Sequence, residues 1–307
     1  MLTAATGPAA PRGGELPVVG TGPPGVLAGP PRPAQLLGGS RHAVYLKLVG
    51  AAGTDSAVPA VVGILARDAV RLPGTVTLAE AADSPLERLL RATWVTVGTG
   101  RVDATGMAGT LSLRIRRWWY PPPPRPPRTL SVAHAALHTA RTELAASPTS
   151  ASGLDRCARA ALADHLDLTA PAAVDQLCQL LLGRGPGLTP SGDDALCGLL
   201  LAHTHFAGHT ATQRLAATVT HNAVQATTTF SASLLTHAAR GAGCPEALAF
   251  LDALSGHRRL QPALAALRRI GHTSGTALAI GACTGALAAL EHRCSARPTR
   301  PDREVQA

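Results

Sequence analysis

Aromatic residues are scarce in this chain of 307 residues: Phe, Trp and Tyr together make up 3%. Charged residues make up only 15%. Because single-stranded nucleic acid is commonly held by stacking its bases on aromatic side chains, the shortage argues against a nucleic-acid platform. Alanine and leucine must form most of the hydrophobic core, which favours closely packed helices.

The sequence also lacks the patterns of exported and membrane proteins. It has no Cys-x-x-Cys pair, residues 1–33 lack the apolar core of an export signal, and no uninterrupted run of about 18 apolar residues occurs. These absences argue against a disulfide framework and against a transmembrane helix. We therefore expect a cytoplasmic protein without a membrane partner. Its reduced thiols would be Cys157, Cys178, Cys197, Cys244, Cys283 and Cys294.

The formal net charge of +9 and the sequence pI of about 10.2 suggest acidic partners. The arginines, however, are dispersed along the chain and form no obvious patch in the sequence. An anionic small molecule or an acidic protein is therefore a better candidate than nucleic acid, which we do not expect as a partner.

The N-terminal part of the chain divides by composition. Residues 1–38 are rich in proline and glycine, which predicts a disordered tail. Residues 39–120 contain short β-prone runs separated by glycines, and residues 111–115 alternate apolar with polar, as in a half-buried strand. We expect a small antiparallel sheet or barrel here, with one helix over 84–91. Its strands are predicted over 42–49, 59–65, 93–97 and 110–117.

A basic and aromatic cluster, Arg116-Arg117-Trp118-Trp119-Tyr120, closes the β-rich part. Such a cluster could stack an anionic ring or a base, or dock a partner. Equally, the aromatic rings could cover a small core while arginines lie over their faces, which is the commoner use of such residues. We favour this structural interpretation.

The proline-rich segment 121–128 predicts a stiff, extended linker between two domains. Residues 129–293 show helical patterning, and residues 294–307 are expected to form a second disordered tail. The predicted fold class is therefore α+β, a small N-terminal antiparallel β domain followed by a C-terminal α-helical domain. The helices are predicted over 131–146, 153–166, 172–182, 194–207, 211–219, 231–239, 244–255, 261–270 and 276–292.

The most informative stretch is Gly183-Arg184-Gly185-Pro186-Gly187-Leu188-Thr189-Pro190-Ser191-Gly192-Asp193-Asp194, which an apolar run follows. Its glycines and prolines interrupt a helix, and a new helix should start at its end. Ser191 and Asp194 match the capping-box pattern. A glycine loop that leads into a helix N-terminus often holds phosphate or carboxylate. The alternative is a glycine-rich helix start with two capping acids and no ligand.

Asp193 and Asp194 complicate an anion site. Successive residues of a helix point about 100° apart, so the two carboxylates cannot both face one ligand closely. We expect one to support the cap and the other to reach the site. A carboxylate beside an anion is tolerated if a cation such as Mg²⁺ lies between them, or if the acid binds a substrate proton. Mg²⁺ held by Asp193 or Asp194 is the only cofactor considered, and nothing requires it.

Two further segments look like polar helix starts. Residues 227–233 are rich in Thr and Ser, and Gly271-His272-Thr273-Ser274-Gly275 precedes another apolar run. If these helix starts converge with Ser191, many donors would surround one pocket. His272 could act there as a base or cation, although a single loop histidine is more often simply exposed.

The glycine stretch, the segment ending Ser231-Ala232-Ser233-Leu234-Leu235, and Gly271–Gly275 occur in this order in a bacterial family. The chain resembles the AllH-type subunit associated with oxamate carbamoyltransferase, from about residue 40 to 292, and the Arg117–Pro121 segment is also similar to members of the family. The resemblance implies a multi-subunit complex that interconverts oxalurate plus phosphate with oxamate plus carbamoyl phosphate in allantoin catabolism.

The resemblance implies an anion site in which Asp193 or Asp194 has a catalytic role, and the loop pattern adds His272 as a third catalytic candidate. Asp193 or Asp194 would orient the carbamoyl nitrogen or a metal. Donors at helix ends suit phosphorolysis, which needs charge stabilisation and positioning. The candidate substrate-binding residues are Gly185, Gly187, Thr189, Ser191, Gly192, Thr228, Ser231, Thr273, Ser274 and Gly275.

One position departs from the family. Relatives often carry an acid two residues after the Ser-Gly of the last motif, where this chain has Ala277. The function predicted is an anion-binding subunit of a carbamoyltransferase complex, a transferase with partner subunits. The alternative, which Ala277 slightly favours, is a non-catalytic module that binds or senses a nitrogen metabolite.

Overall fold

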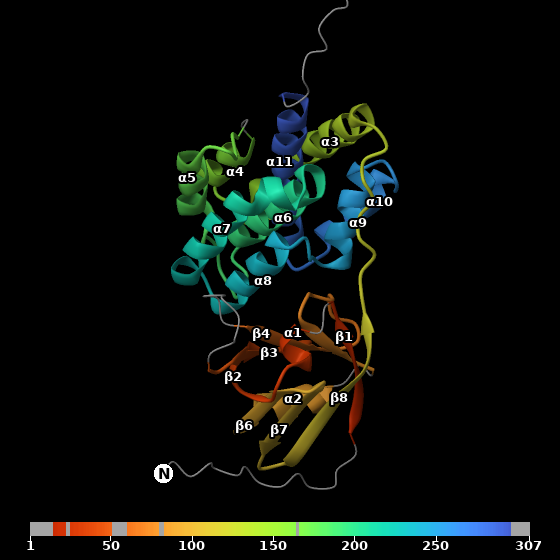
Figure 1. Cartoon of the computed structure of the whole chain (residues 1–307), viewed down its shortest axis with the longest axis vertical. Helices are drawn as coiled ribbons and strands as arrows, with labels where there is room; N and C mark the ends of the chain where they lie inside the picture. The colour runs from red at the N-terminus through yellow and green to blue at the C-terminus, as the bar shows by residue number, and fades with distance from the viewer. Residues whose placement is uncertain (1–14, 23–24, 51–59, 80–82, 164–165, 296–307) are drawn as a thin grey trace, which may run out of the picture. The chain divides into compact units, whose positions relative to one another are not determined.

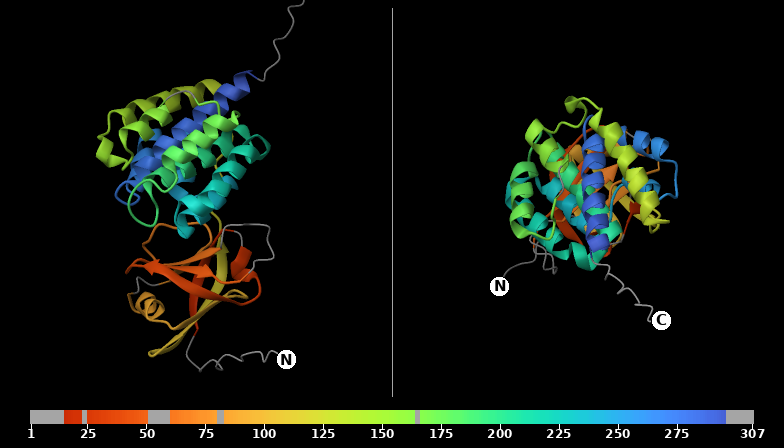
Figure 2. Two further views of the ribbon diagram at one scale, coloured as in Figure 1. Left: turned by 90° about the vertical axis from the view of Figure 1, so that its left-hand side faces the viewer. Right: turned by 90° about the horizontal axis from the view of Figure 1, so that it is seen from above.

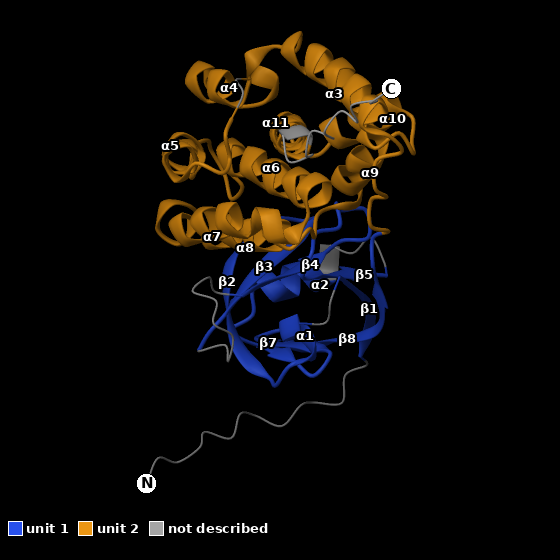
Figure 3. Ribbon diagram, turned by 45° about the horizontal axis from the view of Figure 1, so that its top comes forward, with its two compact units in different colours: residues 1–121 blue, residues 122–307 orange. Residues whose placement is uncertain are grey.

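The computed structural model describes residues 15–22, 25–50, 60–79, 83–163 and 166–295. The chain divides into two compact units, residues 1–121 and residues 122–307, which Figure 3 colours separately. Strands build the first, which we call the barrel unit, and helices build the second, the helical unit (Figure 1). The α+β fold class is confirmed at this level.

Eight strands form a closed barrel in the order β1-β5-β4-β3-β2-β6-β7-β8. The sequence predicts a purely antiparallel sheet, but two strand pairs are parallel: β1 with β8 and β4 with β5. Alternation shows which side chains face inward but carries no information on strand direction, so the prediction is wrong on this point. The elements are β1 Leu16–Thr21, α1 Gly25–Ala28, β2 Arg32–Gly39, β3 Ala43–Leu48, β4 Val61–Leu65, β5 Thr75–Leu78, α2 Asp83–Leu90, β6 Trp94–Gly98, β7 Arg101–Gly106 and β8 Gly109–Trp119.

The predicted tail over 1–38 does not hold from Leu16 onward, because β1, α1 and β2 lie there. β1 pairs with β5 and β8, and β2 pairs with β3 and β6, so distant segments supply most of their partners. Proline and glycine content reports local preference only and misses strands that are held from both sides. Residues 1–14 lie outside the described part of the chain.

The barrel core is aliphatic, with Val44, Leu46, Val62 and Ile64 fully buried. Trp118 packs against this core and lies over Gly20, where a Cβ would overlap its ring. Arg71 lies over the ring of Trp119, with 4.8 Å from Cζ to the ring centroid. These contacts fit the structural interpretation of the basic and aromatic cluster.

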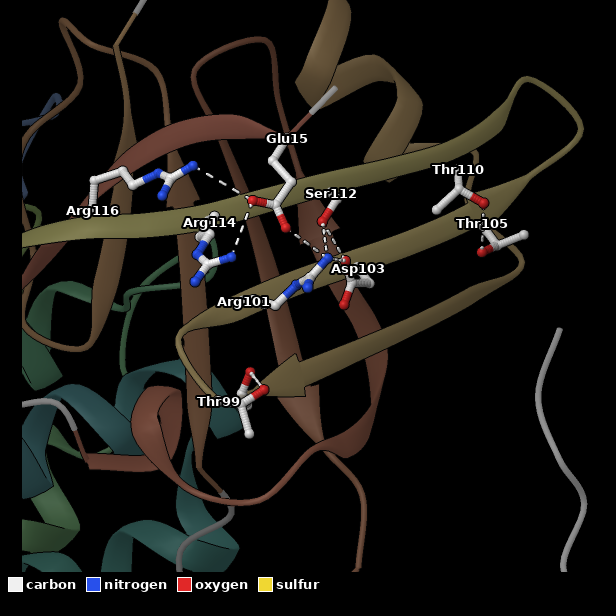
Figure 4. Close-up of polar contacts among 10 residues, drawn as sticks. Glu15, Thr99, Arg101, Asp103, Thr105, Thr110, Ser112, Arg114 and Arg116 are labelled. Atoms are coloured by element: carbon white, nitrogen blue, oxygen red, sulfur yellow. Dashed lines mark hydrogen bonds and ion pairs between the residues drawn. The ribbon is translucent and has the colours of Figure 1, made fainter. Parts of the chain in front are cut away.

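Outside the barrel, a polar network joins β1 to β8 and β7. Glu15, directly before β1, binds Arg101 at 3.0 Å, Arg114 at 3.3 Å and Arg116 at 3.5 Å (Figure 4). Ser112 donates a hydrogen bond to Asp103, which Arg101 also contacts. Exposed ion pairs contribute little singly, but this network bridges the parallel strand pair that closes the barrel.

In the helical unit, Figure 3 shows α11 nearly end-on among α3, α4, α6 and α9. α6 is buried on all sides, with 15 buried residues among its 17. Its apolar run is thus a core helix. The helices are α3 Leu130–Ala145, α4 Arg156–Ala163, α5 Pro171–Leu181, α6 Ser191–Ala207, α7 His209–Ala226, α8 Thr229–Ala239, α9 Pro245–Leu254, α10 Leu260–Arg268 and α11 Ser274–Ser295, with a short 3-10 turn at Thr149–Ala151.

α6 and α11 run parallel, and their backbones are in direct contact at several glycines. A Cβ at Gly281 would overlap the carbonyl oxygen of Ala195, and one turn later a Cβ at Gly285 would overlap that of Leu199. A Cβ at Gly198 would in turn overlap the Leu278 carbonyl oxygen. The blue α11 crosses the interior of the helical unit in both views of Figure 2. Because the two helices are parallel, their N-termini lie at the same end.

Part of the proline-rich segment 121–128 is bound to the helical unit. The backbone N–H and Nε of Arg125 each donate to Asp252 Oδ1 at 3.1 Å, and its Nη2 donates to Oδ2 at 3.0 Å. Arg258 Nε also donates to Oδ2, at 2.9 Å. These bonds lower the pKa of Asp252 to about 2.

α11 is the one described helix that is long and apolar enough to cross a membrane by length and composition. Two thirds of the relevant window, 67%, is buried inside the helical unit. That burial is what the core helix of a folded unit shows.

Candidate functional site

The N-terminal ends of α6, α8 and α11 lie together in the helical unit. The hydroxyls of Ser191 on α6 and Thr273, directly before α11, are 3.0 Å apart. Thr228, the N-cap of α8, accepts a hydrogen bond from the Ser231 N–H at 3.0 Å and donates one to the Leu188 carbonyl of the glycine loop at 2.6 Å. Three segments far apart in the sequence therefore meet around one set of hydroxyl groups.

Asp193 is completely buried, and its hydrogen bonds connect two segments of this junction. Its Oδ1 accepts the Gly183 N–H at 2.8 Å, and its Oδ2 accepts a hydrogen bond from the Thr227 hydroxyl. Burial raises the pKa of Asp193, while hydrogen bonds from Thr227, Gly183 and Ser231 oppose the rise. Since chain donors hold both oxygens, Asp193 joins the start of the glycine loop to the start of α8.

Asp194 is 6% exposed and faces α11 instead. The Ser274 side chain hydrogen-bonds to it, yet its Oδ2 is buried with no hydrogen-bond partner among the residues that the structure describes. Burial raises the pKa of Asp194 to about 7, the Ser274 hydrogen bond lowers it, and the charge of Asp193 raises it further. A buried carboxyl oxygen that lacks a partner is costly, and Asp194 is the one of the two acids with such an oxygen.

The predicted capping box at Ser191 and Asp194 is wrong. Pro190 is the N-cap of α6 without a side-chain cap bond, and Ser191 is already helical. The Asp193 and Asp194 N–H groups donate to the Pro190 carbonyl. The two acids therefore serve tertiary contacts, which a local sequence pattern cannot distinguish from capping.

The glycines of the two Ser-Gly pairs have a packing function. A Cβ at Gly192 would overlap the Leu181 carbonyl oxygen at the end of α5, and a Cβ at Gly275 would overlap that of Leu267 in α10. Their N–H groups donate to the carbonyls of Arg184 at 2.9 Å and Ile270 at 3.0 Å. Neither N–H is therefore open to an anion in this structure.

The loop itself needs glycine for backbone reasons. Gly185 has φ of 123° and Gly187 has φ of 91°, both in the region that L residues rarely adopt. Both glycines are exposed, as is His272, while Thr189 is partly buried. Gly185, Gly187 and His272 thus lie at the surface, whereas the two acids, Ser191 and Ser231 are buried and the other hydroxyl groups of the junction are partly buried.

Sequence reasoning missed three contributors to this junction. Gly183 and Thr227 hold Asp193, and the backbone of Gly153 lies so close that a Cβ there would overlap the Ser191 hydroxyl. Thr227 stands in a segment that the sequence marks as hydroxyl-rich, but nothing local indicates that Gly153, at φ of 63°, approaches it.

The described residues contain no group of three or more His, Cys, Asp or Glu side chains that could hold a metal ion. Asp193 is also surrounded by N–H and O–H donors, which suit a carboxylate but compete with a cation. The site residues do not fit Mg²⁺, which is commonly held by several oxygen ligands.

Comparison with known proteins agrees with the resemblance in the sequence. Residues 181–286, roughly a third of the chain, match the model of a family described as oxamate carbamoyltransferase subunit AllH. The match contains α6, α8 and most of α11 and does not extend to the barrel unit. No solved structure matches the chain. The part of the helical unit that holds Asp193 and Asp194 is therefore similar to the AllH family.

Proposed function

We propose that the chain is a subunit of an oxamate carbamoyltransferase-type complex and that Asp194 is the centre of its substrate site. The ligand is a small anion: phosphate, carbamoyl phosphate, oxalurate or oxamate. The family match supports a carbamoyltransferase system with partner subunits. The observation that carries the site is the buried Asp194 Oδ2, without a partner among described residues, where the N-termini of α6 and α11 meet.

A carboxyl group in an anion site requires an explanation, and the raised pKa of Asp194 supplies one. With a pKa of about 7, a large share of Asp194 is neutral near neutral pH. A neutral carboxyl group donates a hydrogen bond and does not repel an anion. The positive ends of two parallel helices and the hydroxyls of Ser191, Thr273 and Ser274 complete the environment.

The same group suits carbamoyl transfer. When a phosphate oxygen attacks the carbamoyl carbon of oxalurate, the bond from that carbon to the amide nitrogen breaks, and the nitrogen takes a proton as oxamate leaves. Protonated Asp194 supplies that proton and recovers one from the attacking phosphate. A general acid works best when its pKa lies near the working pH, as that of Asp194 does.

The first test is calorimetric titration of the full chain with oxamate from pH 5.5 to 8.5. This range spans about one unit or more on each side of the Asp194 pKa, and oxamate stays a monoanion throughout it. Affinity should fall as pH rises through about 7, since Asp194 loses its proton. Asp194→Asn should bind with little pH dependence, and Asp194→Ala should bind at least about tenfold more weakly. Asp175→Asn, at an exposed position on α5, is the matched control. Unchanged affinity in Asp194→Ala would refute the site.

A non-catalytic, metabolite-binding module is the second candidate. The resemblance implies an acid at the position of Ala277, and the buried alanine there supplies no carboxyl group. The two candidates separate on turnover with partner subunits present. Carbamoyl phosphate release from oxalurate and phosphate, lost in Asp194→Asn, supports the enzyme; oxamate binding without any turnover supports the module.

A further inference from the structure

A cavity of about 310 Å³ opens in the helical unit between α3, α4 and α11. Its volume is at the lower end of the roughly 300–1,000 Å³ typical of small-molecule sites. Arg141 and His138 line it from α3, Arg159 from α4, and Ile280 from α11. None of these residues belongs to the junction around Asp194.

The two arginines bind each other's helices. Arg141 Nη2 donates to the Ala163 carbonyl at the end of α4 at 2.7 Å, and Arg159 donates to the Leu144 and Ser147 carbonyls near the end of α3, both at 3.3 Å. Cations are favourable at helix C-termini, so these bonds account for the placement of the arginines. They use only some of the five N–H donors of each guanidinium group, and the remainder can serve a ligand.

Among the described residues, the lining of the cavity holds two arginines and no acidic side chain. The bonds to the helix ends explain where the two arginines lie, but they do not explain the cavity that both arginines line. An anionic group placed there would make the charge-assisted hydrogen bonds that guanidinium groups form with carboxylates.

The rest of the lining is mostly apolar, and the hydroxyls of Thr142 and Thr284 donate to backbone carbonyls. Leu144, Leu162 and Ile280 contribute hydrocarbon surface, and Cys283 contributes a thiol. Burial raises the pKa of the Cys283 thiol to about 12, although the charge of Arg141 opposes the rise. The thiol is therefore neutral and adds to the apolar part. Such a lining selects a ligand with one anionic end and a short hydrocarbon body.

We propose that this cavity binds a small organic monoanion, a carboxylate with a short aliphatic tail, whose carboxylate lies against Arg141 and Arg159 and whose tail lies against Leu162 and Ile280. This site is separate from the substrate site at Asp194, and its occupant is an additional ligand. Hexanoate fits the chemistry and serves as the probe.

The test is calorimetric titration of the full chain with hexanoate, with hexan-1-ol and hexylamine as uncharged and cationic controls. Hexanoate should bind and the two controls should not. Ile280→Phe, which fills the cavity and leaves both arginines, should weaken binding at least about tenfold, and so should Arg159→Gln. Arg156→Gln removes an exposed arginine of α4 outside the lining and should change nothing.

Two further measurements do not depend on whether the cavity variants fold, and they separate this cavity from the proposed substrate site at Asp194. In the wild type, nuclear Overhauser contacts should join the hexanoate tail to the methyl groups of Leu162 and Ile280. Asp194→Ala should bind hexanoate normally. The proposal is overturned if hexanoate does not bind, if hexan-1-ol binds equally well, if Ile280→Phe binds as the wild type does, or if binding depends on Asp194.

Discussion

Asp193 and Asp194 are adjacent in sequence but have different partners. Asp193 is held by Gly183 and Thr227, whereas Asp194 faces Ser274. The angular spacing of helix residues predicts this separation, and the structure confirms it. It cannot predict which acid is satisfied by the chain, because that depends on Gly183 and Thr227. At the scale of single residues, this difference is the reason for proposing Asp194, and not Asp193, as the centre of the substrate site.

The raised pKa of Asp194 has a consequence for stability. In the unfolded chain an aspartate loses its proton near pH 4, whereas folded Asp194 keeps it up to about pH 7. The folded state therefore binds more protons between these values, and the free energy of unfolding should fall as pH rises from about 4 to about 7. Asp194→Asn should be more stable than the wild type at pH 7.5, by roughly 2–4 kcal/mol at most.

Urea unfolding at pH 4.5 and 7.5 tests this prediction. The advantage of Asp194→Asn over the wild type should be largest at the higher pH and small at the lower one. Burial also raises the pKa of Asp193, so the variant should keep part of the slope. The contribution of Asp252 to stability has the opposite pH dependence. Because its pKa is lowered, Asp252 stabilises the fold above about pH 4, and this stabilisation is lost as pH falls toward 2. An equal advantage at both pH values would contradict the assignment.

At the scale of elements, the parallel pair α6 and α11 brings the two Ser-Gly helix starts to one end. Their closeness depends on glycine, since backbone carbonyl oxygens occupy the space of a Cβ at Gly198, Gly281 and Gly285. Backbone atoms cannot move aside as a flexible side chain can. The two helices must separate before any larger residue fits.

We therefore expect Gly281→Ala to lower the free energy of unfolding by about 3 kcal/mol or more, the upper end of overpacking costs. Gly187→Ala is the control: nothing lies within 4 Å of a Cβ there, and only the positive φ opposes it. That substitution should cost about 1–2 kcal/mol. Chemical denaturation gives both values, and oxamate titration should show that Gly281→Ala also weakens binding. Equal losses in both variants would refute the close packing of α6 on α11.

At the scale of the whole molecule, β1 completes the barrel. It lies between β5 and β8, and without it both would become unpaired edges that invite aggregation. A chain lacking residues 1–21 should therefore lose the cooperative unfolding of the barrel unit. A chain lacking only residues 1–14 keeps Glu15 and β1 and should retain it.

Calorimetry and amide hydrogen exchange distinguish these outcomes. In the chain that lacks residues 1–21, the β5 and β8 amides should lose their protection from exchange. The α6 and α11 amides should keep it, since the helical unit has a core of its own. Protected β5 and β8 amides in the chain that lacks β1 would show that the barrel closes without it.

Strong local patterns predict elements well. Residues 43–48, 94–98 and 109–119 are strands at the predicted places, and the helix predicted over 84–91 is α2 at Asp83–Leu90. β1, β2, β5 and β7 were not predicted, since each is short or rich in glycine, proline and polar residues and depends on partners on both sides. The helix predicted over 211–219 is α7, His209–Ala226, whose polar second half gives a weak apolar pattern.

The sequence by itself determined the α+β class, the helix starts at the three polar motifs and the similarity of residues 181–286 to the AllH family, because these depend on local preference and on motif order. Only the tertiary structure decided that β1 closes the barrel in parallel with β8 and that Gly192 and Gly275 serve helix packing. It also decided that both carboxylate oxygens of Asp193 have partners while Oδ2 of Asp194 has none among the described residues. These properties depend on which distant backbone and hydroxyl groups come within a few ångströms, and no local pattern encodes that.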